Sequence, residues 1–81
     1  MEEGLLFFDN SPKRDLAEKV AAAADRYRFK FGRRPNLCYV HTSALPLDSA
    51  ELNGVRLVGA GNVTKNYFWI GVEQEVLREA A

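Results

Sequence analysis

The fold is decided by residues 12–31, which read PKRDLAEKVAAAADRYRFKF. Apolar side chains recur in this stretch with the period of one helix face, at Leu16, Val20, Ala23, Tyr27 and Phe31. Ser11 and Pro12 are typical of the residues that begin a helix. Gly32 is typical of the residue that ends one. The pattern therefore predicts a long amphipathic helix over residues 12–31.

The end of this segment allows a second interpretation. Basic and aromatic residues alternate from Arg26 to Phe31, and strict alternation is a strand signal. The helical spacing nevertheless continues through Tyr27 and Phe31 up to Gly32, which favours the helix. In a helix Phe29 lies off the apolar stripe, at its edge or in solvent, whereas a strand would place all three rings on one face.

Four short apolar segments predict strands, at residues 4–9, 37–42, 55–58 and 67–72. Pro46 indicates a loop, Asp48 is placed to cap a short helical turn through Leu52, and Asn53-Gly54 is a turn signal. We therefore expect a single small α+β domain over residues 1–81 with the order β-α-β-β-β. In its two layers one long helix packs on a mostly antiparallel sheet of three or four strands. Residues 73–81 are expected to form a terminal helical turn or a tail.

One helix covers only one face of such a sheet. The first and last predicted strands are apolar on both faces, so the uncovered face should present Tyr67 and Trp69, with Tyr39 and Leu37 or their neighbours beside them. Exposed apolar patches of this kind mark interaction surfaces. The candidate interaction face is therefore Tyr39, Tyr67 and Trp69, with a second copy of the chain or another protein as its partner. Folding of the terminal segment over this face is the alternative.

The charges of the chain balance in number and are uneven in position. The sequence holds 11 basic and 11 acidic residues, yet residues 13–34 contain eight of the basic ones and three of the acidic ones. A candidate patch for anions or nucleic acid lies at the end of the predicted helix and consists of Arg26, Arg28, Lys30, Arg33 and Arg34. These cations could neutralise phosphates, and Phe29 could stack on an unpaired base. The alternative is a solvated helix end whose cations complement the helix dipole.

Catalytic and metal-binding patterns are weak in this sequence. Cys38 and His41 are the only residues of their types, and their spacing of three places them on opposite faces of a strand. A zinc site needs about four ligands, which one Cys and one His do not supply. The pair in Gly59-Ala60-Gly61 lacks the third glycine of a dinucleotide-binding loop and precedes a strand instead of a helix. We expect a non-catalytic domain without a cofactor or metal.

The N-terminus also lacks the pattern of a secretory signal. It opens with Glu2 and Glu3, and no apolar run approaches the ~20 residues of a membrane span. The single cysteine excludes a disulfide within the chain. We therefore expect a cytoplasmic protein with no membrane partner.

Three short stretches carry a resemblance that spans residues 20–72. They are Tyr27 with Gly32-Arg33-Arg34-Pro35-Asn36, then Cys38-Tyr39-Val40-His41, and Asn66-Tyr67-Phe68-Trp69-Ile70-Gly71. In these stretches the chain resembles a set of short bacterial proteins of unknown function. That resemblance implies a bacterial domain and supplies no activity, cofactor or catalytic residue.

Overall fold

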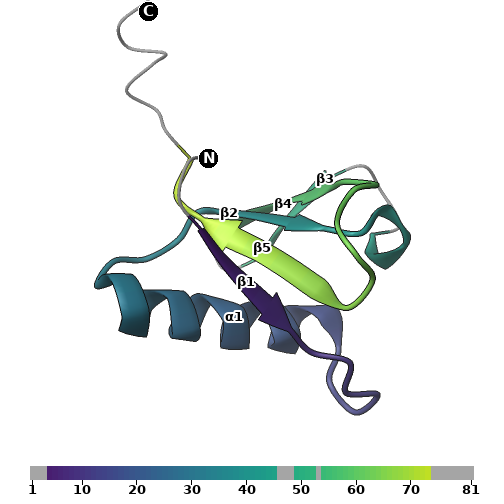
Figure 1. Cartoon of the computed structure of the whole chain (residues 1–81), viewed down its shortest axis with the longest axis horizontal. Coiled ribbons are helices and arrows are strands. Elements are labelled where there is room, and N and C mark those ends of the chain that lie inside the picture. Colours follow the sequence, from purple (N-terminus) through teal and green to yellow (C-terminus); the bar gives the residue numbers. More distant parts are fainter. Residues whose placement is uncertain (1–3, 46–48, 53, 74–81) are drawn as a thin grey trace, which may run out of the picture.

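The computed structural model describes residues 4–45, 49–52 and 54–73 (Figure 1). Its elements are β1 (Gly4–Phe8), α1 (Leu16–Phe31), β2 (Leu37–Val40), the 3-10 helix η1 (Thr42–Ala44), β3 (Ser49–Leu52), β4 (Val55–Gly59) and β5 (Tyr67–Gly71). One helix lies against one side of one sheet, which confirms the predicted α+β class.

The helix begins later than the sequence pattern predicted. Asp15 is its N-cap: the Asp15 carboxylate accepts a hydrogen bond from the Glu18 N–H at 2.8 Å, and the Glu18 carboxylate accepts one from the Asp15 N–H at 3.1 Å. This reciprocal capping box satisfies two amides of the first turn, so the predicted start at Pro12 is wrong. The predicted end is confirmed. Gly32 has φ 77°, and its N–H donates to the Arg28 carbonyl at 2.8 Å.

The sheet is larger and less uniform than predicted. Its five strands lie in the order β1-β5-β2-β4-β3. β5 is antiparallel to both β1 and β2, β3 is antiparallel to β4, and β2 is parallel to β4. The predicted sheet of three or four strands is therefore corrected to a five-stranded mixed sheet, in which β5 is an interior strand.

The additional strand is β3, where a helical turn through Leu52 was predicted. Ser49–Leu52 pairs with β4 in a continuous register from Ser49↔Val58 to Leu52↔Val55. Gly54, at φ 82°, makes the tight reversal between the two strands, as its turn signal predicted. The helical turn is wrong because this cross-strand pairing satisfies the backbone of residues 49–52. Asp48 and Asn53 lie outside the described residues, as do residues 74–81 of the predicted terminal segment.

β2 is shorter than the predicted strand at residues 37–42. It ends at Val40, and the next residues turn into η1. The His41 side chain caps η1, because its Nδ1 accepts a hydrogen bond from the Ser43 N–H at 3.1 Å. This local hydrogen bond replaces further pairing along the sheet.

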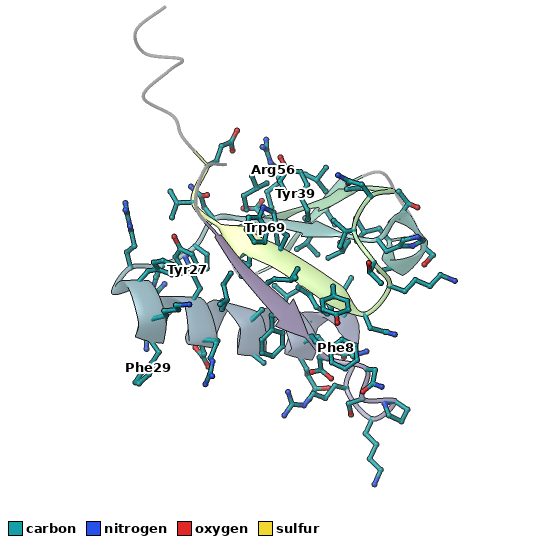
Figure 2. The ribbon with its side chains drawn as sticks, in the orientation of Figure 1. Phe8, Tyr27, Phe29, Tyr39, Arg56 and Trp69 are labelled. Carbon is teal, nitrogen blue, oxygen red and sulfur yellow. The ribbon has the colours of Figure 1, made fainter. Side chains whose placement is uncertain are left out.

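The core lies between α1 and the face of the sheet that α1 covers. The helix contributes Val20, Ala23 and Tyr27, and the strands contribute Cys38, Val40, Val55, Leu57, Phe68 and Ile70. Tyr27 is buried, and its ring centroid lies 4.5 Å from that of Phe31. Phe29 is 86% exposed and points away from the sheet (Figure 2). This position confirms the prediction that Phe29 lies off the apolar stripe.

Candidate functional site

The side of the sheet opposite α1 carries the candidate site, and we call it the open face. Alternation along the strands places on it the side chains that do not point toward the helix, namely Leu6, Phe8, Leu37, Tyr39, Glu51, Arg56, Val58, Tyr67 and Trp69. Figure 2 shows Tyr39, Arg56 and Trp69 together on this side, while Tyr27 lies between the sheet and the helix. Of these open-face side chains only Leu37 is buried, at 1% exposure, and it does not belong to the core cluster under α1.

The strand register places four apolar residues of the open face in one row across the sheet. Leu6 of β1 is opposite Trp69 of β5, Trp69 is opposite Tyr39 of β2, and Tyr39 is opposite Val58 of β4. Directly opposite side chains on one face are close enough to contact one another. The row therefore joins Tyr39 and Trp69, two of the three predicted face residues, into one apolar surface.

Tyr67, the third predicted residue, lies on the same strand and face as Trp69, two residues away. Its ring packs against Phe8 of β1, with centroids 4.9 Å apart and planes inclined by 53°. Aromatic pairs at this separation are favourable beyond the area that they bury. The register thus brings all three predicted aromatic residues onto one surface and extends it onto β1.

Gly4 lets the Trp69 indole lie close to the backbone of β1. A Cβ atom at Gly4 would come within 3.0 Å of Trp69 Cζ2 and within 3.1 Å of the Ile70 carbonyl oxygen. No larger residue fits there unless the ring moves. The absence of a side chain at Gly4 therefore helps to fix Trp69 over the end of β1.

The charges of the open face lie at one end and are paired. Arg56 Nη2 lies 2.9 Å from Glu73 Oε1, and Glu51 is opposite Arg56 in the register. The Glu73 N–H also donates to Asn36 Oδ1 at 2.7 Å. The described part of this face thus carries one arginine beside two carboxylates, which makes it a poor surface for a polyanion.

The predicted basic patch lies elsewhere and is divided between the two sides of α1. Arg26 and Arg28 line a shallow groove along α1 together with Asp25, Phe29 and Phe7 of β1. Arg28 and Arg34 also line a groove of about 220 Å³ between α1 and the β3–β4 hairpin, with Leu52 and Val55. All five basic residues of the patch, Arg26, Arg28, Lys30, Arg33 and Arg34, are exposed.

Cys38 and His41 do not form a reactive pair. Cys38 is buried in the core, and burial raises the pKa of its thiol from 9.0 to about 12. A thiol in this environment is inert, because its nucleophilic thiolate form is suppressed. His41 instead caps η1. No group of three or more His, Cys, Asp or Glu side chains placed to hold a metal ion occurs within residues 4–45, 49–52 and 54–73.

Sequence reasoning missed two exposed residues of the open face and overestimated the exposure of a third. Leu6 and Phe8 are 56% and 50% exposed, although they belong to a continuous apolar run. Leu37 lies on the same face as Tyr39, as expected, but it is only 1% exposed. Alternation within residues 4–9 divides the run correctly into two faces. It does not indicate which of them receives the helix.

No protein-family model matches the chain, and no curated protein or solved structure matches it. Within the part of the chain that the structure describes, no helix is long and apolar enough to cross a membrane.

Proposed function

We propose that this chain is a small non-catalytic binding domain that forms a homodimer through the open face of its sheet. The row Leu6–Trp69–Tyr39–Val58 carries this proposal, because it is a continuous apolar strip on the face that α1 leaves uncovered. Contiguous exposed apolar surface with charged residues at its margin is typical of protein–protein interfaces.

The distribution of aromatic side chains supports a protein as the partner. Tyr and Trp supply large contact area with few rotatable bonds, and they are enriched at the centres of interfaces. Trp69, Tyr39 and Tyr67 are each half-buried, so each retains surface that a partner can cover. A net charge of zero means that two copies do not repel each other at long range.

The test is the mass of the chain in solution. For the wild-type chain we expect light scattering after size exclusion to give about twice the 9.1 kDa of one chain. Trp69→Glu places a charge at the centre of the apolar row and should give the mass of a monomer.

Phe29→Glu is the matched control for this substitution. It adds the same charge at an aromatic residue that is 86% exposed and lies on the helix, away from the open face. This variant should keep the mass of the wild-type chain. A folded Trp69→Glu variant that remains dimeric, or a wild-type chain that is monomeric at high concentration, would contradict the proposed function.

Nucleic-acid binding through the end of α1 is the second candidate. The observation in its favour is the groove that Arg26 and Arg28 share with the exposed ring of Phe29, since cations beside a free aromatic ring suit an unpaired nucleotide. Fluorescence anisotropy with labelled single- and double-stranded oligonucleotides at two salt concentrations tests it. Binding that survives near-physiological salt and is lost on reversing the charges of Arg33 and Arg34 would support this candidate. Absence of binding at low salt would exclude it.

A further inference from the structure

β1 is an edge strand whose outer side is available for pairing. In the strand order β1-β5-β2-β4-β3, β1 has β5 on one side and, among the described residues, no strand on the other. Its sequence, Gly-Leu-Leu-Phe-Phe, contains no charged residue and no proline. Proteins usually protect edge strands with such residues or with bulges, because an open edge pairs readily with another strand. The opposite edge strand, β3, carries Glu51.

A backbone hydrogen bond at the end of β1 shows which of its backbone groups are unpaired within the sheet. The Asp9 N–H donates to the Asn66 carbonyl at 3.0 Å, in the same register that pairs Phe7 with Phe68 and Leu5 with Ile70. In antiparallel pairs the backbone groups of successive residues point alternately toward and away from the partner strand. The peptide groups of Leu5 and Phe7 therefore point toward β5, and those of Leu6 and Phe8 point outward.

The side chains of the same two residues are the exposed apolar ones. Leu6 is 56% exposed and Phe8 is 50% exposed, and both lie on the open face. Outward backbone groups and exposed apolar side chains thus coincide at the same positions. This combination is the one that β-strand addition uses, because backbone hydrogen bonds provide the pairing and side chains provide the selectivity.

The pattern of β1 is complementary to itself. When two copies of the strand pair antiparallel about a two-fold axis at Leu6, Leu6 faces Leu6 and Phe8 faces Gly4. The largest side chain on the open face of β1 is then opposite the residue that has none. Because the Trp69 ring already lies over Gly4, Phe8 of the second copy would meet the edge of that ring. Asp9, the next residue, is already paired with Arg14 at 3.2 Å.

From this coincidence we infer that the partner at β1 is β1 of a second copy, paired antiparallel about Leu6, so that two sheets become one continuous sheet. This inference rests on the proposed function for its partner, a second copy of the chain, but it places the contact along the outer edge of β1 and leaves the rest of each open face uncovered. In this arrangement Leu6, Phe8 and Trp69 line the two-fold axis, and the two open faces lie on the same side of the dimer.

Amide hydrogen exchange of the wild-type chain gives the direct test. The amides of Leu6 and Phe8 should be protected at concentrations at which the chain is dimeric and should exchange rapidly on dilution to the monomer. The amides of Leu5 and Phe7 are internal controls, since their partner β5 belongs to the same chain, and they should remain protected at both concentrations. A dimer in which Leu6 and Phe8 exchange at the monomer rate would overturn the edge pairing and leave the proposed function intact.

A matched pair of variants provides the second test. Leu6→Pro removes an N–H that points away from β5, so it blocks the outer edge and keeps the pairing with β5. Leu6→Ala truncates the same side chain and keeps that N–H. We expect the alanine variant to retain measurable dimerisation. The proline variant should be monomeric at the same concentrations, which corresponds to a dimer dissociation constant at least tenfold higher than that of the alanine variant.

Comparison with Trp69→Glu separates the two hypotheses. If Trp69→Glu is monomeric and Leu6→Pro dimerises as Leu6→Ala does, the copies meet face to face and the edge inference is wrong. If Leu6→Pro is monomeric and Trp69→Glu is dimeric, the edge pairs and the proposed face contact is wrong. Loss of dimerisation in both variants, together with protection of the Leu6 and Phe8 amides in the wild-type chain, supports edge pairing in which Trp69 lies at the contact.

Discussion

The two faces of the sheet are built from the same strands and have different surroundings. In β5, Phe68 and Ile70 are buried under α1, whereas their neighbours Tyr67 and Trp69 are half-buried on the open face. In β2, Cys38 is buried and Tyr39 is half-buried. Each strand is apolar on both faces, and a single helix can cover only one of them. An apolar side chain in this sheet therefore contributes to the core or to a contact surface according to the face that it occupies.

Substitutions at neighbouring residues of β5 should show the largest difference in stability between the two faces. Phe68→Ala removes a ring that is 3% exposed and leaves a cavity under α1, so it should lower the free energy of unfolding by about 3–5 kcal/mol. Tyr67→Ala removes a half-buried ring whose aromatic contact is with Phe8, and it should cost about 1 kcal/mol. Urea denaturation followed by circular dichroism measures both values.

The measurement should be made at low protein concentration, because the proposed dimerisation would add stability to the open face. Equal losses for the two variants would mean that the open face is packed as tightly as the core. That result would contradict the distinction between the two faces.

A smaller difference between the two faces should appear at alkaline pH, in the effect of Cys38 on the free energy of unfolding. Burial raises the pKa of its thiol from 9.0 to about 12, so the unfolded chain releases this proton first. The contribution of Cys38 to stability is therefore complete below pH 9 and is lost as the pH rises toward 12. Between pH 8 and pH 10 the free energy of unfolding should fall by about 1 kcal/mol more for the wild-type chain than for Cys38→Ala, as measured by urea denaturation.

A thiol on the other face is the control for this effect. Tyr39→Cys in the Cys38→Ala background moves the only thiol to the neighbouring residue on the open face, where it is less desolvated. This double variant should show a smaller alkaline loss than the wild-type chain. An equal loss of stability in the two chains would show that burial on the helix-covered face is not the cause of the alkaline destabilisation.

The sequence was most informative where the determinants of structure are local. The apolar stripe predicted α1 and its end at Gly32, and alternation predicted the two faces of β2 and β5. The start of α1 was misplaced because Ser11-Pro12 was preferred over Asp15 and Glu18, which form the capping box. That signal was present in the sequence.

Features that depend on distant parts of the chain were not predictable in the same way. Residues 49–52 have weak strand propensity and become β3 because β4 pairs with them across the turn at Gly54. The place of β5 between β1 and β2 depends on pairing with two segments far away in the sequence. For the candidate site, Tyr39, Tyr67 and Trp69 were selected correctly as neighbours on one face. The contribution of Leu6 and Phe8 required the knowledge of which face of β1 the helix covers.

The position of β5 also has a consequence for the order in which the chain folds. β2, β3 and β4 are close in sequence and can associate early, because the loops that join them are short. β1 precedes them in the chain, yet its neighbour in the sheet is β5, the last strand of the series. During synthesis β1 therefore has no partner within the sheet until residues 67–71 are available. Until then the exposed Leu-Leu-Phe-Phe segment is the part of the nascent chain on which a chaperone would act.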